Sequence, residues 1–397
     1  MKASAISSGN RVNQMGTPAK RKHVCVVTSS HPPLDQRIYF RNVIALLDAG
    51  YEVSYIAPAT TEKLDERLRY YSVPVKAYGE MPRLARYFHR TLKLPYIRRL
   101  ATAIQADYYH MHDTDLISVA LHLKRQIPEC KVFYDIHEYY SRVFSNSLGL
   151  IGDKLARCWI AYERSACLKL DHTFVAVQGI ATELELPQGI CTVIHNYPDP
   201  RLFVQDIVGK PKELGLGAYV GTISKDRGAD YLLQLANDYS LPVRLVVVGR
   251  FLSAKQREEY EQSFRNHPRI EFHENVNHNR LPKLLSDAQF ALSLLDESLE
   301  GLPTKLIEYM ALQCPIITTE CGLSKAIVEE ANCGMVVSRS YSSIRAAVET
   351  LINNPEVGYI AGENGRLQFE RSLNWQNEAQ KMLAVYSSYA EGDPQAC

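Results

Sequence analysis

Long apolar runs and paired cysteines are both missing from this chain of 397 residues. No run approaches about 18 apolar residues, the length that a membrane-spanning helix needs, and residues 1–22 lack the apolar segment of a secretory signal. The nine cysteines form no Cys-x2-Cys pair and lie largely within apolar stretches. We therefore expect a disordered tail at residues 1–21 and reduced, buried thiols in a cytosolic protein.

Net charge is also nearly absent, because 45 lysines and arginines stand against 44 aspartates and glutamates. No global field favours nucleic acid, so any basic partner site is local. Neither half of the chain has Gly-x-Gly-x-x-Gly after its first predicted strand, where the loops read SSHPPLDQR and GTISKDRG, and this argues against a dinucleotide cofactor. What the chain does have is a 46% apolar composition, which at this length is enough for two ordinary cores.

Strand and helix patterns alternate along the chain. From His23 an apolar strand, HVCVVTS, precedes a polar loop, a helical pattern closed by Gly50, and a second strand, YEVSYIAP. This order predicts a βαβ unit, and the strands that follow, separated by helices, extend it into a parallel sheet. These further strands are predicted at residues 106–110, 131–136, 172–177 and 192–195.

The pattern restarts near Gly217 and alternates again as far as PIITTE. The segment between the two series lacks periodicity and carries three prolines, as a linker across a cleft does. The predicted fold class is α/β, with two Rossmann-like domains at residues 22–200 and 201–372. A last helix is predicted at about 373–390, with one face formed by Trp375, Met382, Leu383 and Tyr386.

One segment, EGLPTKLIEYMA at residues 300–311, combines the features of a phosphate and ribose site. Gly301-Leu302-Pro303 lets the backbone approach a ligand and then starts a helix, whose free N–H groups attract phosphate. Glu308 lies about two turns after Glu300 and outside the buried stripe of the helix. Its carboxylate can accept two ribose hydroxyls, while Lys305 supplies charge for a diphosphate. The ordinary alternative is a solvated Glu and Lys on a surface helix.

The same segment resembles the Glu-x7-Glu element of retaining glycosyltransferases with the GT-B fold, and PTKLIEYMALQCPIITT is similar to its family 4 variant. The resemblance covers residues 22–390 in outline. It implies two Rossmann-like domains face to face, with the acceptor mainly on the first and a nucleotide sugar mainly on the second. It also implies that Glu308 holds the donor ribose, that Glu300 approaches the transferred sugar, and that the last helix returns to the first domain.

The loop GTISKDRG, at residues 221–228, follows a predicted strand and enters a helix. Gly221 fits a tight turn, and Lys225 and Arg227 supply cations for a diphosphate, although a basic loop before a helix is also commonly just solvated. Family 4 enzymes usually carry an Arg soon after this glycine, where Thr222 stands here. We expect Arg227, rather than Lys225, to bind phosphate.

A polar cluster, His110-Met111-His112-Asp113, ends a predicted strand of the first half, and such strand ends face the ligand crevice of an open α/β sheet. The family resemblance places His112 near the transferred sugar and the reacting hydroxyl, and a structural histidine is the alternative. Asp113-Thr114-Asp115 also matches the Asp-x-Asp metal signature of a different glycosyltransferase fold. A three-residue match arises by chance and this one lies in the acceptor half, so no metal site is predicted.

Two residue pairs are assigned to the acceptor side. Asp135 and His137 lie at the end of another predicted strand, and a metal there would need a third ligand that the sequence does not identify. Asp35 and Arg37 resemble the Asp-x-Arg-Ile sequence at the start of many bacterial family 4 enzymes. The Asp35 and Arg37 pair either binds the acceptor or caps the helix that follows.

A basic segment runs from Met81 to Leu100, with six Lys or Arg residues and no acid among Leu, Tyr, Phe and Ile. This composition favours contact with a membrane surface and hence a lipid-linked acceptor. Pro95 interrupts the segment, however, and basic amphipathic helices often only cover a core. RNA is a further possibility, but no recognised nucleic-acid motif accompanies the patch, so no nucleic-acid partner is predicted.

Together these features predict a retaining, hexosyltransferase-type enzyme that moves a sugar from a nucleoside diphosphate to an acceptor hydroxyl in cell-surface polysaccharide or glycolipid assembly. Arg227, Lys305 and helix amides near Gly301 stabilise the leaving diphosphate, without a cofactor or an essential metal. Backbone around Val276 is expected at the donor base. Two alternatives remain: a nucleotide-sugar epimerase of the same fold, and a non-catalytic partner subunit, which the presence of Glu308 and Arg227 disfavours.

Overall fold

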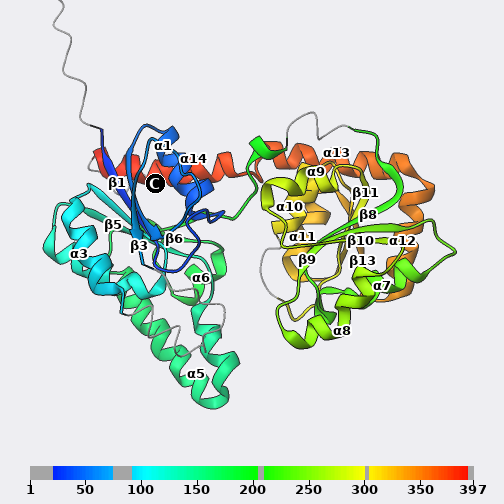
Figure 1. Cartoon of the computed structure of the whole chain (residues 1–397), viewed down its shortest axis with the longest axis horizontal. Coiled ribbons are helices and arrows are strands. Elements are labelled where there is room, and N and C mark those ends of the chain that lie inside the picture. The colour runs from blue at the N-terminus through cyan, green and yellow to red at the C-terminus, as the bar shows by residue number, and fades with distance from the viewer. Residues whose placement is uncertain (1–20, 75–91, 204–209, 300–303, 392–397) are drawn as a thin grey trace, which may run out of the picture.

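The computed structural model describes residues 21–74, 92–203, 210–299 and 304–391. It contains two parallel sheets, each with helices on both faces (Figure 1). The predicted α/β class with two Rossmann-like domains is therefore confirmed. Outside the described residues lie 1–20 of the predicted tail, 81–91 of the basic segment, and Glu300, Gly301, Leu302 and Pro303.

The first sheet has seven parallel strands in the order β3-β2-β1-β4-β5-β6-β7. The order reverses between β1 (His23–Val27) and β4 (Tyr108–Met111), so the loops after these two strands border a crevice at the carboxyl edge. Both strands are almost wholly buried, as parallel strands covered on both faces must be. The other strands are β2 Glu52–Pro58, β3 Arg69–Val73, β5 Lys131–Ile136, β6 His172–Val175 and β7 Cys191–Val193.

Separate apolar cores lie on the two faces of this sheet. One face carries α3 (Leu94–Ile104), α4 (Ile117–Gln126) and α5 (Tyr140–Cys167), of which α5 projects beyond the sheet (Figure 1). The other carries η1 (Ile38–Val43), a π-helical segment that continues into α1 (Ile44–Asp48). The short helices are η2 Thr114–Leu116, α6 Gln178–Glu183, η3 Gln188–Ile190 and η4 Pro200–Leu202.

The last helix, α14 (Trp375–Glu391), packs on the first sheet beside η1 and α1, although it follows the second domain in sequence (Figure 1). The rings of Tyr386 and Phe133 meet edge to face with their centroids 4.9 Å apart. Burying a large apolar side chain stabilises the folded state by about 1.5–3 kcal/mol, so the buried face of α14 holds the helix firmly on the first domain. That face consists of Trp375, Ala379, Met382, Val385 and Tyr386.

The second sheet has six parallel strands in the order β10-β9-β8-β11-β12-β13. Its order reverses between β8 (Glu213–Thr222) and β11 (Ala288–Ser293), which again creates a crevice at the carboxyl edge. The loop after β8 and the segment after β11, where α10 (Thr304–Ala311) begins, both reach that edge. The other strands are β9 Arg244–Arg250, β10 Ile270–Glu274, β12 Ile316–Thr319 and β13 Gly334–Val337.

Helices also cover both faces of the second sheet, and two apolar cores fill the spaces beneath them. Among the described residues, none of the helices has the length and apolar content that crossing a bilayer requires. The helices of this domain are η5 Lys225–Arg227, α7 Ala229–Asn237, α8 Ala254–Arg265, η6 His278–Arg280, α9 Leu281–Leu285, α11 Gly322–Ala331, α12 Tyr341–Asn353 and α13 Pro355–Arg371.

Candidate active site

A cavity of about 450 Å³ lies between the two domains and is lined by both. Four of the predicted donor-side residues, which come from the end of β8, the loop after it and α10, line it together. Their convergence follows from the topology, because β8 and β11 are neighbours at the point where the strand order reverses. The lining residues are Gln36, Arg41 and Asn196 from the first domain and Val220, Gly221, Arg227, Leu281, Thr304, Lys305 and Glu308 from the second.

Lys305 is a buried cation of this wall. Its side chain is 7% exposed, and its Nζ has no hydrogen-bond partner within the described part of the chain. The ammonium lies 4.5 Å from the centroid of the Tyr219 ring. Burial, with a smaller contribution from the charge of Arg227, lowers the pKa of Lys305 to about 7. A buried ammonium in this state is costly, and an anion in the cavity would offset the cost.

Glu308 lies one turn further along α10 and is also buried. Burial raises its pKa to about 7, although the charges of Arg41 and Lys305 act in the opposite direction. A group near its pKa at neutral pH changes charge easily when a ligand binds. In its ionised form the carboxylate can accept two hydroxyl donors.

The loop from Gly221 to Gly228 needs both of its glycines. Gly221 has φ of 141° and Gly228 has φ of 88°, where other residues are rare. A Cβ on Gly228 would also lie 2.5 Å from the Cβ of Leu294. Glycine here therefore lets the turn η5 pass close to the strand end and aim Arg227 at the cavity.

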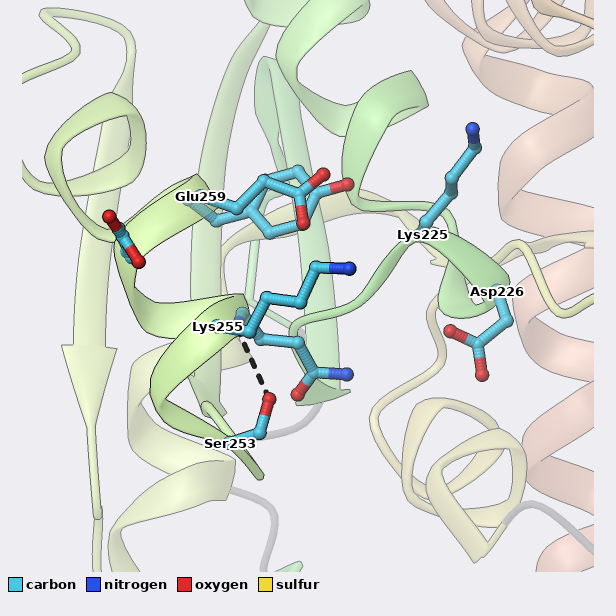
Figure 2. A pocket seen from close by; sticks show the side chains of 8 residues that line it. Lys225, Asp226, Ser253, Lys255 and Glu259 are labelled. Carbon is cyan, nitrogen blue, oxygen red and sulfur yellow. Dashed lines mark hydrogen bonds between the residues drawn. The ribbon is translucent and has the colours of Figure 1, made fainter.

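Lys225, two residues before Arg227, faces elsewhere. It lines a separate cavity of about 680 Å³ on the second domain together with Asp226 and the start of α8 (Figure 2). There it is accompanied by residues of both charges, including Lys255 and Glu259. The structure thus separates two cations that the sequence places in one loop.

Val276, predicted near the donor base, follows β10. It is half-buried and packs against one of the two apolar cores of the second domain.

Histidines and Asp135 gather at the carboxyl edge of the first sheet, where β4 and β5 end. His112 Nδ1 lies 3.2 Å from His137 Nε2 and 3.4 Å from Asp135 Oδ2. Its ring stacks on His110 at a centroid distance of 4.4 Å, and His110 Nδ1 lies 2.8 Å from the Tyr386 hydroxyl of α14. Burial lowers the pKa of His112 to about 4, despite the hydrogen bond with Asp135, so the ring is neutral at pH 7.

Asp135 is held by Arg37 in a buried, two-pronged ion pair. Arg37 donates from Nε at 3.0 Å and from Nη2 at 2.7 Å to the two carboxylate oxygens. Burial opposes ionisation of Asp135, but the positive charge of Arg37, with help from His137, holds the pKa of Asp135 well below its ordinary value. Two parallel charge-assisted bonds fix the carboxylate in one orientation beneath the histidines.

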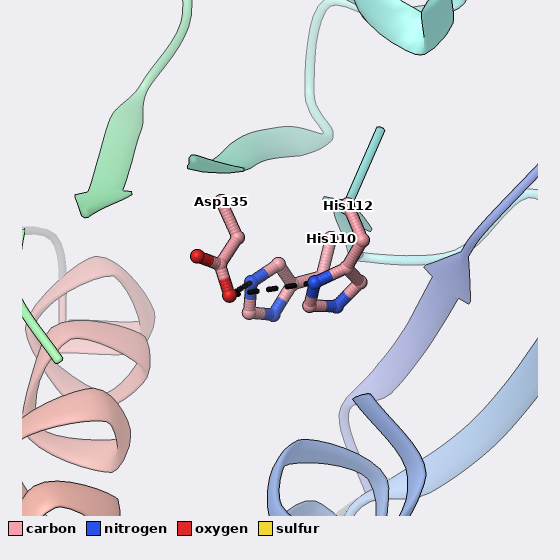
Figure 3. A group of neighbouring side chains, drawn as sticks. All are labelled: His110, His112 and Asp135. Atoms are coloured by element: carbon pink, nitrogen blue, oxygen red, sulfur yellow. Dashed lines mark ion pairs between the residues drawn. The ribbon is translucent and has the colours of Figure 1, made fainter. Parts of the chain in front are cut away.

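His110, His112 and Asp135 are also spaced as metal ligands, since one ligand atom from each lies within 4.8 Å of the others (Figure 3). Zinc accepts such nitrogen and oxygen ligands. Arg37, however, already binds both oxygens of Asp135, so a divalent cation here would lie close to a guanidinium. The arrangement favours a buried ion pair over a metal centre, and the expectation of no essential metal remains a prediction.

Two aspartates that the sequence singled out hold loops in place. Asp35 accepts hydrogen bonds from the backbone N–H of Arg37 at 2.8 Å and of Ile38 at 3.0 Å, which caps η1. A direct acceptor contact by Asp35 stays a prediction. Asp113 anchors the loop after β1 by accepting hydrogen bonds from the Thr28 hydroxyl, the Ser29 backbone and the Ser30 hydroxyl.

Sequence reasoning missed the cavity residues that the first domain contributes, Gln36, Arg41 and Asn196. Arg41 lies in η1, and Asn196 lies in the segment after β7, 155 residues later. Arg41 stands four residues after Arg37, which is the only local sign that the two share a helix face. Nothing in the sequence near Asn196 indicates a site.

Residues 202–368 match the family model of glycosyl transferases group 1. The matched region includes Arg227, Lys305 and Glu308, the three charged residues that the second domain places in the cavity wall. The chain carries the domain of a group 1 glycosyltransferase. This match and the relatives named below support a transferase of the EC 2.4 type.

Two relatives match this chain at low identity, one over most of its length and one over about half of it. An uncharacterized glycosyltransferase of Haemophilus influenzae is 24% identical over 351 residues, or 84% of this chain and 91% of that protein. Another, from Methanocaldococcus jannaschii, is 21% identical over 188 residues, which is 47% of this chain, and the chain spans only about half of its length (52%).

Solved structures of similar shape support the GT-B fold. Sucrose-phosphate synthase from Thermosynechococcus elongatus aligns with a TM-score of 0.71 and 19% identity over 94% of this chain and 100% of that one. Anabaena HepE in complex with UDP aligns with a TM-score of 0.65 and 14% identity over 92% of this chain and 100% of that one. At these identities the likeness establishes the arrangement of the two domains.

Proposed function

We propose that this glycosyltransferase moves a sugar from a nucleoside diphosphate sugar to an acceptor hydroxyl with retention of anomeric configuration. The observation that carries the proposal is the buried ammonium of Lys305, which lacks a hydrogen-bond partner within the described residues and lies in one cavity wall with Arg227 and Glu308. A nucleoside diphosphate offers negative charge to the two cations and ribose hydroxyls to the carboxylate. HepE, a structure of similar fold, was solved with UDP, which supports a donor of this class.

In the proposed reaction, the bond between the anomeric carbon and the distal phosphate oxygen breaks, and negative charge develops on the leaving diphosphate. Arg227 and Lys305 stabilise that charge, together with helix amides near Gly301. The acceptor hydroxyl attacks from the face that the diphosphate leaves, and a donor phosphate oxygen takes its proton. No protein nucleophile is needed. Glu300 positions the sugar rather than bonding to it covalently.

The first domain is proposed to bind the acceptor. His112 is the residue placed beside the transferred sugar, since its buried Nε2 has no hydrogen-bond partner within the described part of the chain. The ion pair of Arg37 and Asp135 holds the histidines in position, and His137 contacts both His112 and Asp135. Asp35 supports the same edge of the sheet by capping η1.

We propose a lipid-linked acceptor at the inner face of the plasma membrane, in cell-surface polysaccharide or glycolipid assembly. The support is an exposed apolar stripe on α5, formed by Ile151, Leu155 and Tyr162, with exposed Lys154 at its flank. Apolar residues flanked by cations are typical of helices that lie on anionic membranes. Leu92 and Tyr96, at the end of the predicted basic segment, are also exposed.

A screen of nucleotide sugars for thermal stabilisation tests the donor assignment. A donor at about 100 times its Kd adds about 2.7 kcal/mol to the free energy of unfolding, which raises the Tm by several degrees. Glu308→Gln and Arg227→Ala should lose this shift, while Lys225→Ala is the matched control because Lys225 lines the other cavity. If no nucleotide or nucleotide sugar raises the Tm of the wild type, the proposal fails.

Two further measurements test the mechanism once a donor is known. The anomeric coupling constant of the product in NMR should show the configuration of the donor, and an inverted product would refute same-face attack. Turnover should be unchanged in excess chelator, because the cations in the cavity wall are side chains. Loss of turnover that added divalent metal restores would show that a metal is essential.

A further inference from the structure

Arg41 brings a positive charge from the first domain into the cavity wall formed mainly by the second. We propose that Arg41 binds the donor diphosphate directly, so that the acceptor domain completes the donor site. The inference rests on the proposed function and deepens it. It concerns a residue outside the family match, which begins at residue 202.

The local fold aims Arg41 at the cavity. In η1 the backbone N–H of Asn42 bonds to the carbonyl of Arg37 at 3.0 Å, a five-residue spacing that widens the turn. Residues four apart in such a turn lie nearly above one another, and the Nη1 atoms of Arg41 and Arg37 both donate to Asn196 Oδ1, at 2.9 and 3.2 Å. Arg37 then turns inward to Asp135, while Arg41 lines the cavity.

The charges around the cavity favour a dianion. Its described lining includes three cations, Arg41, Arg227 and Lys305, and one acid, Glu308. Burial and the neighbouring charge of Arg37 lower the pKa of Arg41 to about 10, against the attraction of Glu308, so the guanidinium stays charged at neutral pH. Two excess positive charges in a partly enclosed space create a field that concentrates anions there.

Position supports a direct contact as well. Arg41 lines the same cavity as Gly221, Arg227 and Lys305, so a ligand that reaches the second-domain cations also enters the space that Arg41 borders. A guanidinium suits phosphate because its planar donors can bind two oxygens at once.

Two structural roles compete with this one. Arg41 lies near Glu308, so it could act by orienting the carboxylate that is proposed to hold the ribose. It could also act only through Asn196, by shaping the segment after β7. If Arg41 only orients Glu308, its loss should weaken the binding of a nucleoside and of its diphosphate equally, because both carry the ribose. If Arg41 acts only through Asn196, its loss should not weaken the binding of one of these ligands more than that of the other. Direct contact with phosphate affects the diphosphate alone.

Calorimetric titration of a nucleoside diphosphate, and of the nucleoside with the same base, distinguishes these roles. The base is taken from the thermal screen, and the proteins are the wild type, Arg41→Gln, Arg41→Lys and Arg201→Ala. In Arg41→Gln the side-chain amide can still donate a hydrogen bond to Asn196, but the positive charge of the guanidinium is removed. Arg201 is the control, since it shares a neighbouring cavity with Arg41 but does not line the donor cavity.

Removing a hydrogen bond to a charged group typically weakens binding about 10- to 100-fold, and we expect this loss for the diphosphate with Arg41→Gln. The affinity of Arg41→Gln for the nucleoside should stay unchanged. The diphosphate affinity of Arg41→Lys should lie between those of the wild type and Arg41→Gln, and that of Arg201→Ala should equal the wild-type value. Equal losses for both ligands, or no loss for either, would overturn the inference while leaving the donor assignment intact. A wild type that binds no nucleoside diphosphate at all would refute the proposed function and this inference together.

Discussion

Replacing Lys305 by methionine is expected to stabilise the fold while it removes activity. Burial lowers the pKa of Lys305 from 10.5 to about 7. Each pKa unit corresponds to about 1.36 kcal/mol, so this burial costs the folded state about 4 kcal/mol at pH 7. Methionine fills a similar volume without charge, but it loses the contact of the ammonium with the Tyr219 ring, a contact of about 1–2 kcal/mol. The net gain in free energy of unfolding is therefore about 2–3 kcal/mol.

The pH dependence of this gain has a definite sign. Because the folded state binds the Lys305 proton less tightly than the unfolded chain does, the wild type gains stability as the pH rises from about 7 toward 10.5. Arg227 acts in the same direction as burial, whereas Glu308 and Cys321 oppose it. The advantage of Lys305→Met is thus largest below pH 7 and shrinks by about 1.4 kcal/mol per pH unit above it.

Urea denaturation of the wild type and Lys305→Met at pH 6, 7.5 and 9 measures both the gain and its slope. The exposed Lys283 offers a matched control, and Lys283→Met should change the free energy of unfolding by less than about 0.5 kcal/mol. Donor turnover by Lys305→Met should fall by at least about 100-fold, because one electrostatic contact to the leaving group is lost. This expectation would be refuted by a Lys305→Met protein that is less stable than the wild type, or by a stability difference that is the same at all three pH values. Either result would show that the Lys305 ammonium already has a stabilising partner in the ligand-free enzyme.

Three more outcomes follow from the same contacts. Arg37→Ala should destabilise the fold by about 3–5 kcal/mol in urea, because it leaves the buried Asp135 carboxylate unpaired, and a loss below about 1 kcal/mol would mean that the pair is not buried in solution. Affinity for a nucleoside diphosphate should fall as the pH rises above about 7, since Lys305, with a pKa of about 7, loses its proton there. Calorimetry in buffers of different ionisation enthalpy should show proton uptake on binding above pH 7, and a flat affinity profile from pH 7 to 9 would contradict this expectation. Sedimentation with anionic vesicles should capture the wild type but at least about fivefold less of Ile151→Ser with Leu155→Ser, and equal capture would remove α5 from the membrane contact.

Much of the fold could be predicted from local sequence. The strand expected at residues 131–136 is β5, and the one expected at 172–177 begins where β6 begins. Such strands are recognisable because parallel strands buried on both faces read as short apolar runs. The donor side could be predicted in part, since the loop GTISKDRG and the segment EGLPTKLIEYMA supply Arg227 and Lys305. The structure brings both residues to the edge where β8 and β11 are neighbours.

The remaining features depend on tertiary contacts that leave no local pattern. Arg37 reaches Asp135, 98 residues away, and Tyr386 reaches His110, 276 residues away. A buried carboxylate or histidine is difficult to recognise in a sequence, because its burial is stable only when a partner offsets the desolvation cost, and that partner can be far away along the chain. Lys225 and Arg227 are alike in sequence terms, and only the geometry of the turn η5 sends them to different cavities.

The most direct test of the proposed donor site is the release of nucleoside diphosphate from the nucleotide sugar that the thermal screen selects. Mass spectrometry would follow the release over time by the wild type, Lys305→Met and Lys225→Ala, with an acceptor extract present. Release by the wild type and Lys225→Ala, with a loss of at least about 100-fold in Lys305→Met, is the predicted result. Release by Lys305→Met at the wild-type rate would place the reaction outside the cavity that Arg227, Lys305 and Glu308 line.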